Sequence, residues 1–269
     1  MPAARDVRYQ YLRPDEIVAA RNACPVCYIP IGTLEWHGPH LPTGSDVFQA
    51  EALAIRAAEL GGGLAFPPLW FGESRLESLM EAVADDREAI AREMDLSPDN
   101  FTQSMMPFTA MEQTTHYVDL LMHILAEVMS LGFKVGVLVA GHYPLIDHAR
   151  AAILRFNKWR GSKTGGLLAW ACLDYLPLIG QYPEPGDHAS AWETSHMLHI
   201  MPERVDLSAL PADGTPVVGI MGSIPPQKGT AEQGRETLEK SAVWVAAEAA
   251  KRLENPAFYR KHGMSLHEG

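Results

Sequence analysis

The stretch Ile29-Pro-Ile-Gly-Thr-Leu-Glu-Trp-His-Gly-Pro-His-Leu-Pro-Thr-Gly-Ser-Asp46 decides the fold class, because it joins a strand to a helix through a stiff loop. Val26 to Ile31 is a short apolar run, which predicts a buried strand. Asp46 to Leu60 has the spacing of an amphipathic helix, and three glycines at 61–63 would end it. The glycines and prolines between strand and helix suit a fixed connection without helical structure.

The same alternation of apolar runs and helical spacing continues along the chain. Further strands are expected at 64–66, 135–140 and 167–173, and helices at 114–131, 145–159, 194–200 and 232–253. Strands crossed by helices are typical of a largely parallel sheet. We therefore expect an α/β fold over residues 1–269, a single-domain three-layer sandwich with a mostly parallel central sheet and helices on both faces.

Residues 70–112 break this rhythm, since a charged stretch is followed by the segment from Pro98 to Pro107. The segment has too few apolar residues to hold a core of its own. We expect it to be an excursion over one face of the domain, near the site described below.

Composition excludes several classes of protein. The formal net charge of −11 argues against a nucleic-acid partner, since phosphate binding uses clustered Lys and Arg. No apolar run approaches the roughly 18 residues that a membrane span needs, and the N-terminus lacks the apolar core of a signal peptide. We expect a cytoplasmic protein with no membrane partner and a small-molecule substrate.

Three cysteines are too few for a disulfide framework, and an odd number fits a reducing compartment. Cys24 and Cys27 have the spacing of a redox or zinc pair, but Cys172 is far away in sequence. The favoured interpretation is that Cys24 and Cys27 are small buried residues at the start of a strand.

Glu35, His37 and Asp46 are the strongest candidates for metal binding. Glu35 and His37 are two residues apart, so in extended backbone their side chains point to the same side. The loop can bring Asp46 back to them, and a helix N-terminus favours the anionic form that binds metal. Each residue alone has an ordinary alternative, namely helix capping for Asp46 and packing for His37.

Further candidates follow the later strands. His142 comes directly after the run 135–140, and ligands in open α/β sheets bind beyond the carboxyl ends of strands. His188 and Glu193 follow the strand that ends near Leu173. His196 and His199 have a helical spacing that metal could use, although capping and packing are favoured for them. Tyr143 and Trp192 flank proposed ligands and either contact substrate or pack as buried aromatics.

These residues resemble the creatininase (creatinine amidohydrolase) family, whose motif is a strand followed by Glu-x-His-Gly-x-His-Leu-Pro, a short spacer and Asp. The resemblance extends to Gly141-His142 and to His188-Ala-x-x-x-Glu193-Thr-Ser, so it spans most of residues 26–200. It implies two divalent ions per chain, zinc or manganese, with iron as a further option. Carried over, Asp46 would bridge them, with Glu35 and His142 on one ion and His37 and Glu193 on the other.

Two departures from the family pattern bear on the substrate. Creatininase has an acidic residue two positions past the histidine, where this chain has Pro144, so Glu193 would have to complete the second ion. The segment from Glu73 to Glu81 also lacks the family's Gly-x-Ser-x-Glu-His sequence. Since that region helps to form the mouth of the site in the family, we expect a substrate other than that of the best-known members.

The expected activity is hydrolysis by a metal-activated hydroxide that opens a small polar ring, either a lactam-like amide or a cyclic polyol ketone or diketone. His188 is expected to be the catalytic proton shuttle. The alternatives are creatinine amidohydrolase proper, a metal-dependent isomerase or lyase, and a non-catalytic family member. The resemblance also implies a homo-oligomer, often a hexamer; the exact substrate, the metal and the contact surface stay open.

Overall fold

The computed structural model describes residues 6–72, 86–161, 166–261 and 264. Its centre is a four-stranded sheet in the order β2-β1-β3-β4, formed by β1 (Val26–Ile31), β2 (Leu64–Ala65), β3 (Val135–Ala140) and β4 (Leu168–Leu173). Every pairing is parallel, with Ile31 opposite Ala140 and Ala140 opposite Leu173. The three long strands therefore end level with one another, at the edge where the candidate residues follow.

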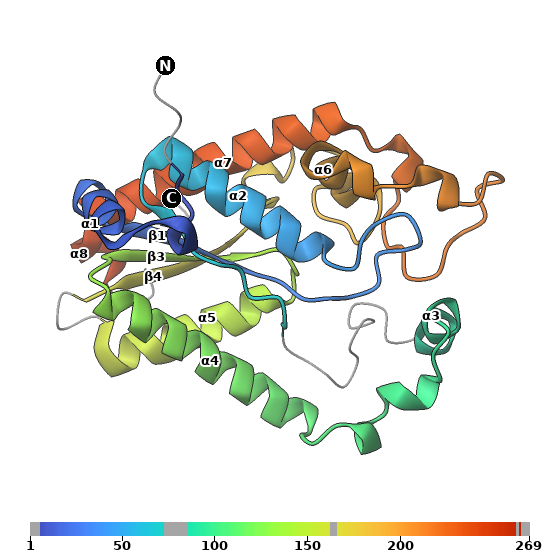
Figure 1. The fold of residues 1–269 in the computed structure, drawn as a ribbon, viewed down its shortest axis with the longest axis horizontal. Coiled ribbons are helices and arrows are strands. Elements are labelled where there is room, and N and C mark those ends of the chain that lie inside the picture. Colours follow the sequence, from blue (N-terminus) through green and yellow to red (C-terminus); the bar gives the residue numbers. More distant parts are fainter. Residues whose placement is uncertain (1–5, 73–85, 162–165, 262–263, 265–269) are drawn as a thin grey trace.

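Helices cover both faces of the sheet, as Figure 1 shows, so the expected three-layer α/β architecture is confirmed. One face carries α2 (Ser45–Gly61) and α7 (Ala231–Glu254), and the other carries α4 (Ala110–Ser130) and α5 (Leu145–Phe156). The remaining helices are α1 (Pro14–Ala23), α3 (Arg87–Glu93), α6 (Ala191–Ile200) and α8 (Pro256–Tyr259). None of the helices in the described ranges has the length and apolar character that crossing a bilayer requires.

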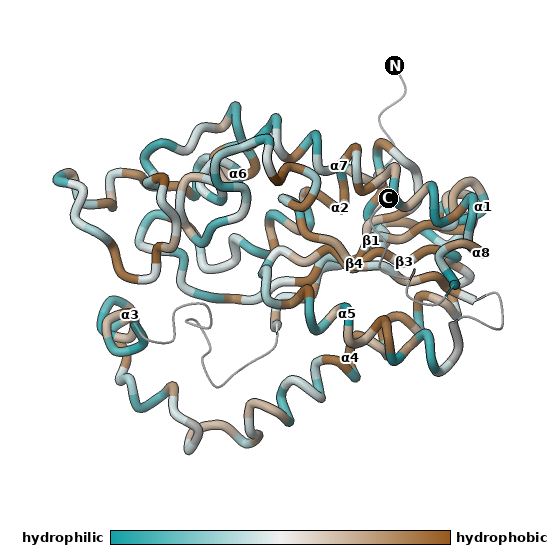
Figure 2. Tube along the Cα trace, turned by 180° about the vertical axis from the view of Figure 1, so that it is seen from behind, coloured by the Kyte–Doolittle hydropathy of each residue, from teal (hydrophilic) through white to brown (hydrophobic). Residues whose placement is uncertain are grey.

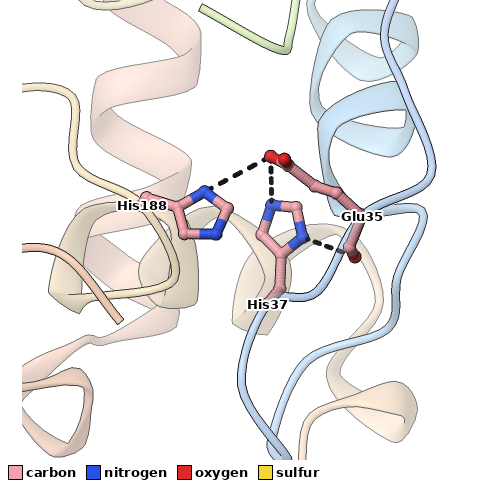
Figure 3. A group of neighbouring side chains, drawn as sticks. All are labelled: Glu35, His37 and His188. Atoms are coloured by element: carbon pink, nitrogen blue, oxygen red, sulfur yellow. Dashed lines mark hydrogen bonds and ion pairs between the residues drawn. The ribbon is translucent and has the colours of Figure 1, made fainter. Parts of the chain in front are cut away.

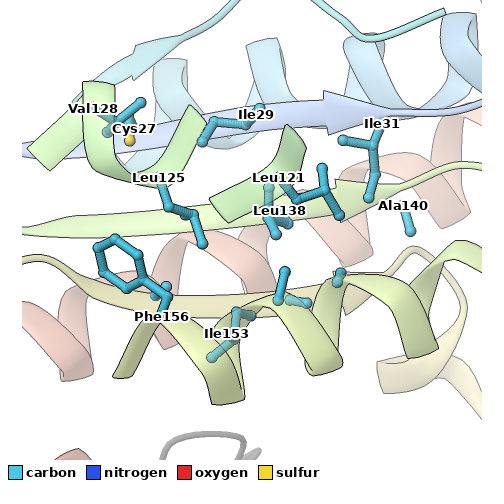
Figure 4. Packing of buried hydrophobic residues seen from close by; sticks show 14 of the residues in the cluster. Cys27, Ile29, Ile31, Leu121, Leu125, Val128, Leu138, Ala140, Ile153 and Phe156 are labelled. Carbon is cyan, nitrogen blue, oxygen red and sulfur yellow. The ribbon is translucent and has the colours of Figure 1, made fainter. Parts of the chain in front are cut away.

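Alternation along the strands divides the interior into two cores. Cys27, Ile29 and Ile31 point toward α4 and α5, where they meet Leu121 and Phe156 (Figure 4). The intervening strand residues point toward α2 and α7. Because successive strand side chains alternate between faces, a strand that is apolar throughout fills both layers. In Figure 2 much of the hydrophobic colour gathers around the strands of the sheet.

Pro30 lies inside β1, where a missing N–H would normally weaken a central strand. Its carbonyl accepts from Leu69 N, so its backbone polar groups face the edge of β1 beside β2. Because the Pro30 backbone faces this edge, its missing N–H takes no hydrogen bond away from the pairing of β1 with β3.

Two expectations about the connecting segments are refined. Helix α5 ends at Phe156 rather than Trp159, and a π-helical turn, Asn157–Gly161, follows it. In the described part of the 70–112 excursion, Ile90, Ala91 and Phe101 pack on Trp36 and Val218. The excursion therefore packs on the loop that follows β1. Glu73 to Glu81, which the sequence singled out at the mouth, lies outside the described residues.

A buried ion pair in α7 gives a stability prediction. Arg252 is fully buried, stacks on Trp170 at 4.2 Å and donates to Glu248 Oε2 at 2.7 Å. Glu248→Gln removes a carboxylate charge from beside a buried guanidinium, so we expect the free energy of unfolding to fall by about 2 kcal/mol. Urea unfolding measures this, with the exposed Glu254→Gln in the same helix as control. Equal stability of both variants would contradict it.

Candidate metal centre

Five ionisable side chains meet beyond the carboxyl ends of β1 and β3. They arrive on four segments of chain: the loop after β1 brings Glu35 and His37, the first turn of α2 brings Asp46, the turn after β3 brings His142, and the first turn of α6 brings Glu193. All five side chains are buried, with 2% or less of each exposed. The sequence-predicted metal ligands therefore lie together in one cluster.

The cluster contains two sets of ligand atoms that share Asp46. Glu35, Asp46 and His142 form one set, and His37, Asp46 and Glu193 form the other; in each, the candidate atoms lie within 4.8 Å of one another. Asp46 Oδ2 lies 3.3 Å from His142 Nδ1, and Asp46 Oδ1 lies 2.9 Å from His37 Nε2. Because its two oxygens face different sets, Asp46 can bridge two cations.

The charges of the cluster fit cations as well. Three carboxylates are buried here, and every ion pair that they make in the described part of the chain is with a histidine. Glu35 Oε2 is buried and has no hydrogen-bond partner among the described residues. Burying three carboxylates close together is costly unless positive charge balances them, so the cluster is suited to hold cations. Carboxylate and imidazole ligands without thiolate suit zinc, manganese or iron.

His37 has its tautomer fixed by the backbone. Its Nδ1 lies 3.1 Å from the carbonyl oxygen of Glu35, which can only accept, so Nδ1 carries the proton and Nε2 faces the carboxylates. This is the arrangement in which an imidazole nitrogen binds metal while the other nitrogen is held by a carbonyl. Burial alone would lower the pKa of His37, but the charges of Asp46 and Glu193 raise it well above its ordinary value. A proton and a cation therefore compete for Nε2.

The side chain of His188 faces Glu35 and His37, as Figure 3 shows. Its Nε2 donates to the carbonyl oxygen of Trp36 at 2.8 Å, so Nδ1 is the nitrogen that faces Glu35 Oε1, at 3.4 Å. The ring lies 4.5 Å from that of His37, and 11% of the side chain is exposed. In addition, the backbone of His188 pairs with Met221 in both directions. His188 is thus a rigidly held imidazole that presents one nitrogen to the cluster.

The two aromatic candidates differ in their surroundings. The Tyr143 hydroxyl is buried without a hydrogen-bond partner in the described chain, and burial together with the charges of Asp174 and Glu193 raises its pKa well above the ordinary value. Trp192 is buried, and its indole N–H donates to Asp174 Oδ2 at 2.9 Å. Trp192 packs as a buried aromatic in this structure, and contact with substrate stays a prediction for both residues.

The remaining sequence candidates lie outside the cluster. His196 is buried 2.9 Å from Gln49 Oε1 and 2.8 Å from Thr237 Oγ1, and His199 lies on the exposed side of α6, so the packing interpretation fits His196. Cys27 is fully buried in β1 and its thiol donates to the carbonyl oxygen of Val135. Cys24 is only partly buried and its thiol donates to the carbonyl oxygen of Gly61, so the expectation of a buried residue fits Cys27 but not Cys24.

Sequence reasoning missed three residues near the centre, Asp174, Asp187 and His40. Burial and the charge of Glu193 raise the pKa of Asp187 to about 8, against the lowering effect of three backbone N–H donors. Burial raises the pKa of Asp174 to about 7. His40 Nε2 forms a hydrogen bond with Thr194 Oγ1 at 3.1 Å. Burial, together with the charge of His37, lowers the pKa of His40 to about 4. The second histidine of Glu-x-His-Gly-x-His was a signal for His40, whereas nothing local marked the two aspartates.

Comparison with known proteins gives a consistent picture. A family model described as creatinine amidohydrolase matches residues 10–253. A 3-dehydro-scyllo-inosose hydrolase of Thermotoga maritima is 23% identical over 216 residues, which are 73% of this chain and 57% of that protein. The chain thus spans less than two thirds of the length of this relative.

Solved structures share the fold. A crystal structure of creatinine amidohydrolase (creatininase) is 23% identical, with a TM-score of 0.68 over 94% of this chain and 99% of that chain. A manganese creatininase and a mutant creatininase of Zn-Zn type are each 24% identical, with TM-scores of 0.66. Each covers 94% of this chain, and the match spans 100% of the manganese chain and 99% of the Zn-Zn chain.

Proposed function

The chain belongs to the creatininase family, and from this premise we propose that it is a dinuclear metal-dependent hydrolase that opens a small polar cyclic substrate. The observation that carries the proposal is the pair of ligand sets that share Asp46, with His188 beside them. Glu35, Asp46 and His142 would hold one ion, and His37, Asp46 and Glu193 the other. Zinc or manganese held there would supply Lewis acidity, which lowers the pKa of bound water to about 7 and polarises a carbonyl.

Glu193 takes the place of the acidic ligand that is missing at Pro144. Pro144 is exposed and precedes α5, while Glu193 Oε2 lies 3.4 Å from His37 Nε2. Glu193 also accepts from Ala189 N at 2.7 Å, which fixes the direction of the carboxylate. The second set therefore keeps a carboxylate even though the turn after β3 supplies none.

His188 has the geometry of a proton shuttle. With Nε2–H committed to the Trp36 carbonyl, Nδ1 alone can take a proton at the cluster and give it to a leaving group. Water oxygen would add to the ring carbonyl carbon, and the bond from that carbon to nitrogen or carbon would break. The leaving atom takes the proton, and the product carries a new carboxylate.

The ring is proposed to be either a lactam-like amide or a cyclic polyol diketone. The family description supports the amide, and the Thermotoga relative supports the carbocyclic ketone. A second carbonyl in the 1,3 position would stabilise the carbanion when a carbon–carbon bond breaks. The purified zinc and manganese enzymes should be incubated in ¹⁸O-water with creatinine and with 3-dehydro-scyllo-inosose. Label in a lasting carboxylate would identify the substrate class, whereas label-free turnover would favour an isomerase or lyase.

Replacing His188 with glutamine tests the shuttle. We expect turnover to fall by about 10² to 10⁴ while both ions stay bound, because the lost nitrogen belongs to neither proposed ligand set, although His188 also groups with Glu35 and His37 as a possible ligand. Steady-state kinetics and elemental analysis measure the two effects. The control is His123→Gln on α4, whose side chain is 65% exposed. Unchanged turnover would remove His188 from the mechanism, and loss of an ion would assign it to the ligands instead.

A further inference from the structure

Helix α6 begins without the side-chain cap that its own sequence offers. Ser190 stands at the N-cap position, but its hydroxyl donates to the carbonyl oxygen of Ile224 and makes no cap bond. The first backbone N–H groups of a helix have no partner within the helix and are costly to bury. Since Trp192 and Glu193 are buried, something else must satisfy this turn.

Asp187, three residues before Ser190, supplies the missing acceptors. Its Oδ1 accepts from Ser190 N and from Glu193 N, each at 3.2 Å, and its Oδ2 accepts from Trp192 N at 2.7 Å. Asp187 is itself 9% exposed. The carboxyl group of Asp187 therefore accepts from three backbone donors of the turn that carries a proposed ligand.

The chain reverses sharply between Asp187 and this turn. Ala189 has a φ of +55°, which a residue with a side chain adopts at a cost in energy. Its N–H donates to Glu193 Oε2, and His188 just before it pairs with Met221. Because Asp187 holds the turn on one side and Met221 on the other, His188 and Glu193 face the cluster together.

We propose that Asp187 is a positioning residue for the second metal, acting through the backbone of α6 on the Glu193 carboxylate. This inference rests on the proposed function, since it assumes that Glu193 is a ligand. Residues that orient metal ligands through hydrogen bonds typically change metal affinity by about 10- to 100-fold when they are removed. Asp187→Ala should therefore lower the affinity for the ion of the His37, Asp46 and Glu193 set by that factor. The ion of the Glu35, Asp46 and His142 set should stay bound.

Zinc titration of the chelator-treated full chain, followed by calorimetry, tests this. Wild type should bind two ions, Asp187→Ala should bind one tightly and one weakly, and Asp187→Asn should lie between them. The asparagine can still accept the two bonds at Oδ1 but places an N–H against Trp192 N. A loss of affinity confined to one of the two ions would not arise from a general loss of stability.

The matched control is Thr109→Ala, which removes the cap of α4, where Thr109 Oγ1 accepts from Glu112 N at 3.3 Å. It should lower the melting temperature as a lost cap does, without changing either zinc affinity. If Asp187→Ala binds both zinc ions with unchanged affinity, the positioning role is overturned while the proposed function stays intact. Failure of wild type to bind any zinc would instead overturn the proposed function.

Discussion

Replacing Asp46 with asparagine is expected to release both ions and, with them, to abolish the metal-dependent turnover. Two ligand sets carry the proposal, one with His142 and one with Glu193. Among the described residues, Asp46 is the one that these two sets share. Its two oxygens lie 2.9 Å from His37 Nε2 and 3.3 Å from His142 Nδ1. The amide keeps the shape of the side chain but loses the charge and one acceptor, so neither ion keeps its full set.

Elemental analysis of purified wild type and Asp46→Asn, side by side, measures the first effect. Glu193→Gln is the informative comparison, because Glu193 belongs to one set only and its loss should release one ion. The exposed Asp147→Asn, in the first turn of α5, should change nothing. Retention of two ions by Asp46→Asn would contradict the bridged arrangement. Absence of metal from wild type would support a non-catalytic family member.

Replacing Gly141 with alanine is expected to disrupt the site although it removes no ligand. A Cβ on Gly141 would overlap the carbonyl oxygen of Asp46 and would lie 3.1 Å from the Ala50 Cβ. Both belong to the first turns of α2, which pack directly on the backbone after β3. The overlap is with backbone rather than with a flexible side chain, so α2 or the turn after β3 must move. We expect the free energy of unfolding to fall by about 3 kcal/mol, with a loss of metal affinity.

Gly136→Ala, in the strand that precedes this turn, provides the matched control. A Cβ there would lie 3.2 Å from a terminal methyl of Leu167, which can adjust by a few tenths of an ångström. This variant should lose little stability and keep both ions. Denaturant unfolding and zinc titration of the two variants measure the contrast. If Gly141→Ala binds two ions as tightly as Gly136→Ala, the close contact between the turn after β3 and Asp46 is not needed for the centre.

Local patterns predicted most of the fold. The apolar runs at 26–31 and 135–140 are strands over those residues, and the helix expected at 46–60 is observed at Ser45–Gly61. Hydrophobic periodicity records which faces are buried, and this is a property of neighbouring residues. The pattern missed α1 and placed the end of α5 three residues too late, where a π-helical turn takes over.

The residues of the candidate centre could also be named from the sequence. Glu35 and His37 share one side because of their two-residue spacing, and the ends of parallel strands bring His142 to within 3.0 Å of Glu35. That each residue is a ligand stays a prediction until metal is measured. From the sequence we could predict which types of ligand atom are present and at which edge of the sheet they meet.

Only the tertiary structure decided how these residues are held. The capping of α6 by Asp187, the fixed tautomer of His188 and the contact that requires a glycine at 141 all join segments that are separated along the chain or folded back by an unusual turn. The packing of the excursion on Trp36 is of the same kind. Periodicity reports burial but not the partner, because the partner of a buried polar group is set by how loops and helices pack in three dimensions.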